Sequence, residues 1–106
     1  MNEARINLLK NYIEEEPNEP FNYYALACEY LNNQEEEALQ LFEKLLTDFP
    51  DYLATYYQAA QLLQEFEEEE RALAVYEKGI TLAQVQNNAK TLNELKVAKQ
   101  NLEFEM

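Results

Sequence analysis

Apolar residues recur along the chain at helical spacing, in segments separated by short polar stretches. One face is formed by Tyr23, Leu26, Ala27, Tyr30 and Leu31, and the next segment repeats the spacing with Ala38, Leu41, Phe42 and Leu45. Residues three and four apart lie on the same side of an α-helix. The pattern predicts helices at about 2 to 16, 20 to 33, 35 to 48, 52 to 66, 68 to 84 and 88 to 104, with ends defined to about 2 to 4 residues.

An internal repeat organises these segments. The sequence YYALA at 23–27 recurs as YYQAA at 56–60, and ALQLFEK at 38–44 recurs as ALAVYEK at 72–78. The first pair is offset by 33 residues (56 − 23) and the second by 34 (72 − 38), so the earlier copy is one residue shorter, at the turn near Asn32 to Glu35. Each copy is therefore predicted to be a pair of helices. Pro50 closes the first copy, because proline disfavours helical geometry in the residue before it.

This pattern resembles the tetratricopeptide repeat, whose signature is W-x2-L-G-x2-Y, then A-x3-F, then P. The first copy matches with Tyr23 at the tryptophan position, followed by Leu26, Ala27, Tyr30, Ala38, Phe42 and Pro50. The second copy matches at Tyr56, Ala59, Ala60, Leu63, Ala72 and Tyr76, but Gln84 stands where a proline would close the repeat. Without that proline two alternatives remain open: the fifth helix ends near residue 86, or it runs on into the sixth.

The resemblance implies an all-α fold, a right-handed α-solenoid of antiparallel helix pairs with about six helices. Residues 1–106 are expected to form a single domain, with an N-terminal half-repeat helix at 1–18, repeat 1 at 20–51, repeat 2 at 52–86 and a capping helix at 87–106. One stripe of the capping helix carries Ala89, Leu92, Leu95, Ala98 and Leu102. Two full repeats are fewer than the roughly three that a stable stack needs, so the flanking helices are expected to complete the core.

The charge balance narrows the choice of partners. The chain has 21 acidic and 8 basic residues, a formal net charge of −13, which repels nucleic acid and anionic membranes. The opening MNEARINLLKNYIEEE lacks the continuous apolar stretch of a signal peptide, and no other stretch approaches the length of a membrane span. The chain is accordingly predicted to be cytoplasmic, with no nucleic-acid or membrane partner.

The sequence offers little material for catalysis. It has no histidine, its single glycine, Gly79, lies inside a predicted helix, and its single cysteine, Cys28, has no neighbouring cation to activate it. No catalytic residue, cofactor or metal site is predicted, and the protein is not expected to be an enzyme. Gly79 falls on the inward side of its helix, which favours close packing over a hinge.

Acidic runs at 14–16, 35–37 and 67–70 are the most conspicuous polar feature. The second and third begin predicted helices, where negative charge complements the helix dipole, and no calcium-loop pattern accompanies any of them. They are interpreted as solvated faces, with a steering surface for a basic partner as the alternative.

The resemblance places ligand binding on a concave surface lined by the first helix of each pair. The residues expected to face it are Phe21, Tyr24, Cys28, Leu31 and Asn32 in the first copy, and Tyr57, Gln58, Gln61, Gln64 and Glu65 in the second. Tyrosines serve as amphipathic anchors, and glutamines bond to a peptide backbone through either end of the amide. The alternative, that Tyr24 and Tyr57 only pack against a neighbouring helix, stays open.

One branch of the family holds the acidic C-terminal tails of chaperones with basic residues on this surface. None of the groove candidates is basic, so such tails are not expected to bind. The predicted occupant is a neutral or basic peptide or protein segment. The competing hypothesis is a structural one, in which the chain forms a homodimer or larger assembly through its terminal helices, with Leu92, Leu95 and Leu102 as the seam.

Overall fold

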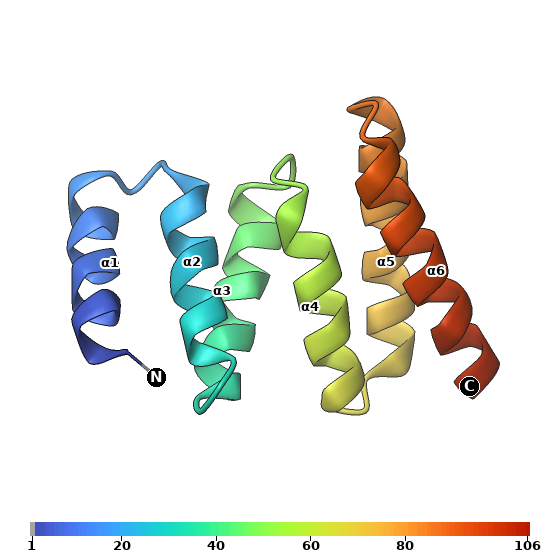
Figure 1. Cartoon of the computed structure of the whole chain (residues 1–106), viewed down its shortest axis with the longest axis horizontal. Coiled ribbons are helices and arrows are strands. Elements are labelled where there is room, and N and C mark those ends of the chain that lie inside the picture. Colours follow the sequence, from blue (N-terminus) through green and yellow to red (C-terminus); the bar gives the residue numbers. More distant parts are fainter. Residues whose placement is uncertain (1) are drawn as a thin grey trace. The chain divides into compact units, whose positions relative to one another are not determined.

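The structure is a computed structural model that describes residues 2–106, and in this range it consists of six helices (Figure 1). They are α1 (Glu3–Glu15), α2 (Pro20–Tyr30), α3 (Glu35–Asp48), α4 (Ala54–Glu65), α5 (Glu69–Val85) and α6 (Ala89–Glu105). The expected all-α architecture is confirmed, and every helix lies within a few residues of its predicted range. The chain forms two compact units: unit 1 ends at Tyr52 and unit 2 begins at Leu53.

Unit 1 contains α1, α2 and α3, which follow one another as antiparallel neighbours, with α1 packed on α2 and α2 on α3 (Figure 1). Local chemistry sets the helix starts. The Asn2 side chain accepts a hydrogen bond from the backbone N–H of Arg5 at 3.0 Å, and Pro20 occupies the first position of α2, where its missing N–H costs nothing. The buried apolar residues include Ile6, Leu9, Leu26, Ala27, Phe42 and Leu45.

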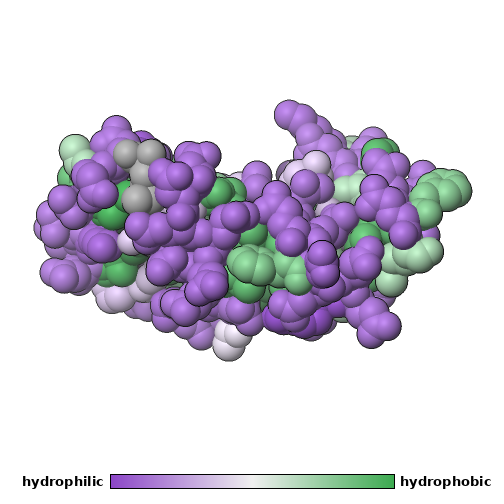
Figure 2. Space-filling model, turned by 90° about the horizontal axis from the view of Figure 1, so that it is seen from below, coloured by the Kyte–Doolittle hydropathy of each residue, from purple (hydrophilic) through white to green (hydrophobic). Residues whose placement is uncertain are grey.

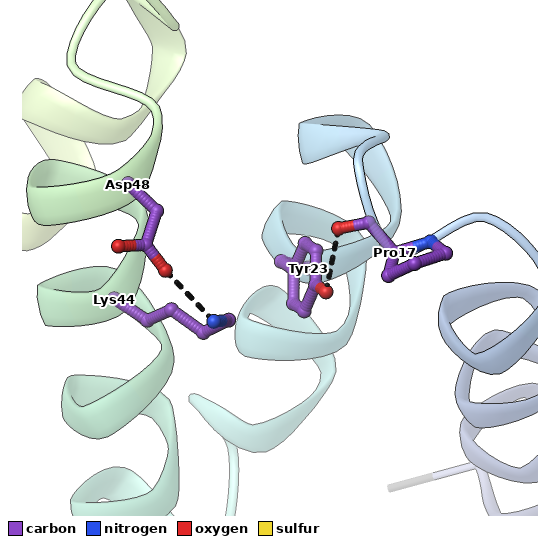
Figure 3. Close-up of polar contacts among 4 residues, drawn as sticks. All are labelled: Pro17, Tyr23, Lys44 and Asp48. Atoms are coloured by element: carbon purple, nitrogen blue, oxygen red, sulfur yellow. Dashed lines mark hydrogen bonds and ion pairs between the residues drawn. The ribbon is translucent and has the colours of Figure 1, made fainter.

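Tyr23 on α2 interacts with the turn that follows α1 and with α3 (Figure 3). Its hydroxyl donates a hydrogen bond of 2.8 Å to the carbonyl oxygen of Pro17, in the turn that follows α1. Its ring lies 5.4 Å from the Nζ of Lys44 on α3, and that ammonium group also pairs with Asp48 Oδ2 at 2.8 Å. The aromatic residue at the tryptophan position of the repeat therefore has both a packing role and a polar one.

Unit 2 contains α4, α5 and α6, again as antiparallel neighbours, with α4 on α5 and α5 on α6 (Figure 1). Gly79 lies where the three helices come together. A Cβ atom on Gly79 would lie 2.7 Å from the Cβ of Tyr56 on α4 and 3.0 Å from a methyl carbon of Leu95 on α6. The interpretation of Gly79 as a close-packing residue is thus confirmed.

The helices α4 and α5 end in the same way, although neither is followed by a proline. Glu67 and Asn87 adopt positive φ angles of 61° and 56° just beyond the two helix ends. The next N–H groups, of Glu68 and Asn88, return to the carbonyls of Leu63 and Ala83 at 2.9 Å each, which is the Schellman arrangement.

Of the two alternatives left open for the fifth helix, the structure shows that α5 ends at Val85. The Asn88 side chain then accepts a hydrogen bond from the N–H of Thr91 at 3.0 Å and starts α6. Asparagine tolerates the left-handed conformation and is a favourable N-cap. The pair Asn87-Asn88 therefore ends α5 and starts α6 where the repeat has no closing proline.

The outer surface is mainly polar. Figure 2 shows hydrophilic residues over most of one face, with hydrophobic residues gathered in separate patches. Within residues 2–106, no helix combines the length and apolar character needed to cross a membrane. The same residues contain no group of three or more acidic, cysteine or histidine side chains that could hold a metal ion.

Candidate functional site

A groove runs between α4 and α6 of unit 2. Its volume is about 520 Å³, within the range of ligand sites in proteins. It is lined by Tyr57, Gln61 and Gln64 from α4 and by Asn93, Glu94, Val97, Ala98, Asn101 and Glu105 from α6. Three of the residues predicted from the sequence are thus brought together, and all three come from the first helix of the second repeat.

The polar groups of the α4 wall are held by a buried tyrosine. Gln61 Nε2 donates a hydrogen bond of 3.1 Å to the hydroxyl of Tyr76, which donates in turn to Gln64 Oε1 at 2.6 Å. The Tyr76 side chain lies on α5 and is completely buried, and this burial raises the pKa of its hydroxyl. The hydroxyl therefore stays protonated at neutral pH and keeps both bonds.

The groove has an apolar part and an acidic part. Tyr57 is 36% exposed and Val97 is 56% exposed, so a ligand can cover apolar surface on both walls. Glu94 and Glu105 line the α6 side, while none of the lining residues is a lysine or arginine. Lys99 of α6 pairs with Glu77 of α5, with 3.6 Å between Nζ and Oε1.

The corresponding face of α2 in unit 1 is aromatic and apolar. The Tyr24 ring lies 6.2 Å from Phe42 and 5.7 Å from Tyr52, measured between ring centroids, so this tyrosine is half-buried in an aromatic cluster. Cys28 is also half-buried, and burial raises the pKa of its thiol. Of the two alternatives for Tyr24, packing against neighbouring side chains describes its position in unit 1.

The other predicted groove residues are distributed as follows. Phe21 and Asn32 are exposed and Leu31 is half-buried, all in unit 1. On α4, Gln58 is half-buried and Glu65 is exposed, and neither lines the groove. Of the candidates on α4, Tyr57, Gln61 and Gln64 are the ones that line the groove.

The α6 wall is not among the sites predicted from the sequence. Asn93, Val97, Asn101 and Glu105 recur every four residues, which is a helical face in its own right. The apolar stripe predicted for this helix lies next to that face and shares only Ala98 with the groove lining. Tyr76 was also missed as a polar residue, because it was assigned to the aromatic position of the repeat.

The seam residues proposed for self-assembly lie mostly inside unit 2. Leu95 and Leu102 are fully buried, and Leu92 is half-buried. Their packing within the unit already uses the apolar surface that a partner would need. The large apolar side chains that α6 and the following residue leave exposed are Val97, Phe104 and Met106.

Two solved structures of tetratricopeptide repeat domains are similar to most of this chain. A tetratricopeptide repeat domain protein from Salinibacter ruber, solved by NMR, is 39% identical, with a TM-score of 0.78 over 82% of this chain and 89% of that one. A crystal structure of a tetratricopeptide repeat domain protein from the same organism is 38% identical, with a TM-score of 0.78 over 80% of this chain and 96% of that one.

A third structure supports the fold alone. A protein from Bordetella parapertussis matches with a TM-score of 0.80 over 99% of this chain and 91% of that one, at 21% identity. No protein-family model matches the sequence, and no curated protein matches it.

Proposed function

Because the chain belongs to the tetratricopeptide-repeat family, we propose that it is a protein-interaction module that binds a peptide or protein segment and catalyses no reaction. The expected segment is neutral or basic, and its expected position is on the first helices of the repeats. An acidic chaperone tail is not an expected ligand, since the groove lining contains no basic residue.

The observation that carries this proposal is the groove between α4 and α6. It combines a partly exposed tyrosine, four side-chain amides and an exposed valine. Together they offer apolar contact as well as hydrogen-bond donors and acceptors. An extended peptide needs both kinds of contact, because its backbone amides must be satisfied while alternate side chains are buried.

The proposal can be tested with a phage-displayed library of random linear peptides, selected on the purified chain. Selected peptides are synthesised, and their dissociation constants are measured for wild type, Tyr57→Ala and Gln61→Ala. Both substitutions are expected to weaken binding by about tenfold, the effect of losing about 1.4 kcal/mol of contact. Gln84→Ala is the matched control, because Gln84 is exposed on α5 and does not line the groove. Peptides that bind both groove variants as tightly as wild type would contradict the proposal.

Self-assembly is a second candidate function, and the exposure of α6 favours it. Phe104 is 84% exposed, and Met106, two residues further on, is 56% exposed. Light scattering at low and high salt measures the solution mass. A dimer that persists in high salt and is lost in Phe104→Asp would support this function, whereas a monomer at all concentrations would argue against it. Leu95→Glu is unsuitable for this test, because Leu95 is buried within unit 2.

A further inference from the structure

The Tyr76 hydroxyl fixes the hydrogen-bonding character of the α4 wall. A hydroxyl group has one proton, so when it bonds to two amides it donates to one and accepts from the other. Here it accepts from Gln61 Nε2 and donates to Gln64 Oε1. Gln61 Oε1 therefore remains available as an acceptor, and an N–H of Gln64 remains available as a donor. Reversing the direction of this chain exchanges the two roles but still leaves one donor and one acceptor.

Two amides held by the same hydroxyl, one with a free acceptor and one with a free donor, can bond to one residue of an extended peptide. In an extended chain the N–H and C=O groups of a single residue point to the same side, as in the hydrogen-bonded pairs of antiparallel strands. Such a residue can donate to Gln61 and accept from Gln64 at once. Because Tyr76 is fully buried and immobilises both amides, little side-chain entropy is lost when the peptide binds.

The charge of the groove defines the side chains that fit it. Glu94 and Glu105 line its α6 wall, and no lysine or arginine lies among the lining residues. Unit 2 as a whole has the same sign, with nine acidic and five basic residues between Leu53 and Met106. A lysine or arginine in the ligand would complement these carboxylates, whereas an acidic side chain would be repelled. Tyr57 and Val97 offer apolar surface for a neighbouring aliphatic side chain.

We infer that the groove between α4 and α6 takes an extended peptide segment that contains a lysine or arginine, and that Gln61 and Gln64 read the backbone of one of its residues. The inference rests on the proposed function and adds to it the chemistry of the ligand. Tyr76 is a positioning residue in this arrangement, because it acts on the peptide only through the two glutamines.

The test begins with the peptides selected from the random phage library on the full chain. They are expected to be enriched in lysine or arginine, and replacing that residue by norleucine should weaken binding by about tenfold. The double variant Glu94→Gln, Glu105→Gln should show a weaker dependence of binding on salt than wild type. Selection of neutral or acidic peptides, or an unchanged salt dependence in the double variant, would overturn the inference.

Backbone reading is tested with peptides that carry a single N-methyl group at each position in turn. At one position, N-methylation is expected to weaken binding to wild type by about tenfold, because it removes the N–H that Gln61 accepts. In Tyr76→Phe the penalty at that position should shrink to about twofold, since Gln61 is no longer held. A merely structural role of Tyr76 would weaken all the peptides equally and leave this ratio unchanged, which would overturn the inference.

The outcomes separate the two levels of the proposal. Failure to select any peptide would overturn both the proposed function and this inference. Peptides that depend on Tyr57 and Gln61 but carry no cation, or show the same N-methyl penalty in Tyr76→Phe, would overturn the inference and leave the proposed function standing. Resonance shifts in a ¹⁵N-labelled chain show whether the peptide lies against α4 and α6; shifts confined to unit 1 would likewise overturn the inference.

Discussion

The helix pairs α2–α3 and α4–α5 are copies of one repeat, yet they differ at the aromatic position of the second helix. Phe42 and Tyr76 are 34 residues apart (76 − 42) and both are completely buried. At the positions equivalent to Gln61 and Gln64, 33 residues earlier, unit 1 has Cys28 and Leu31. The hydroxyl and its two amide partners are therefore present together in one copy and absent together in the other. The same backbone carries a polar face in unit 2 and an apolar face in unit 1.

A second pair of equivalent positions differs in volume. Leu45 in unit 1 corresponds to Gly79 in unit 2, and both lie on the buried side of their helices. In unit 1 the space is filled by a leucine side chain, whereas in unit 2 it is taken by Tyr56 and Leu95 from the neighbouring helices. The two units therefore fill this position with different side chains. The two copies of the repeat share their helices but differ in the packing of their cores.

The largest effect is expected for Leu45→Ala. Leu45 is completely buried, so its truncation leaves a cavity and should lower the free energy of unfolding by about 3 kcal/mol. Urea denaturation followed by circular dichroism measures this loss. Leu46→Ala is the matched control, because Leu46 is only half-buried and should cost less. Equal losses in the two variants would mean that the site collapses around the cavity.

Gly79→Ala places an alanine at the position of unit 2 that is equivalent to Leu45. It should destabilise the protein by overpacking, whereas Leu45→Ala does so by leaving a cavity. The new methyl group would lie 2.7 Å from Tyr56 Cβ, which sits next to the α4 backbone and cannot move alone. We expect a loss of about 2 kcal/mol in the free energy of unfolding. An exposed position of the same helix, Thr81→Ala, provides the control. An unchanged or raised stability in Gly79→Ala would show that helix propensity outweighs the clash.

Exchanging the two aromatic residues tests the polar difference directly. Phe42→Tyr places a hydroxyl where Cys28 and Leu31 stand in place of the two glutamines, and should cost about 2 kcal/mol for the burial of a poorly paired polar group. Tyr76→Phe removes two hydrogen bonds but leaves Gln61 exposed to water, so it should cost only about 1 kcal/mol. Thermal and urea denaturation of both variants give the comparison. A smaller loss for Phe42→Tyr than for Tyr76→Phe would contradict it.

The smallest effect is expected at the end of α4. Glu67 has a φ angle of 61°, which is unfavourable for a residue with a side chain, whereas Asn87 at the equivalent place after α5 is better suited to it. Glu67→Gly should raise the free energy of unfolding by about 0.5 to 1 kcal/mol. Glu70→Gln, in the first turn of α5, controls for the removal of one negative charge from the same run. A loss of stability in Glu67→Gly would show that its side chain makes a compensating contact.

The helices were accessible from the sequence because their signals are local. The 3.6-residue spacing of apolar residues and the prolines at 17, 20 and 50 define α1 to α3 to within a few residues. The end of α5 has no closing proline, and its signal is instead the pair Asn87-Asn88, which marks a helix end followed by an N-cap.

The groove was accessible only in part. Tyr57, Gln61 and Gln64 follow from the position of the first helix in a repeat, and the structure places all three together. Its second wall depends on how α6 packs against α5, which no local pattern records. The bonds of Tyr76 likewise join residues 15 and 12 positions apart, and the repeat signature treats this position as an aromatic core residue.

Cys28 provides a natural probe for the local opening of unit 1. It is the chain's single cysteine, it is half-buried against Tyr24, and burial holds its pKa above the usual value, so the unreactive thiol form dominates at neutral pH. An aromatic disulfide reagent should then label the folded protein slowly and the unfolded protein quickly. The labelling rate then measures the opening of α2. It can be followed by mass spectrometry without an engineered probe, and it does not report on unit 2.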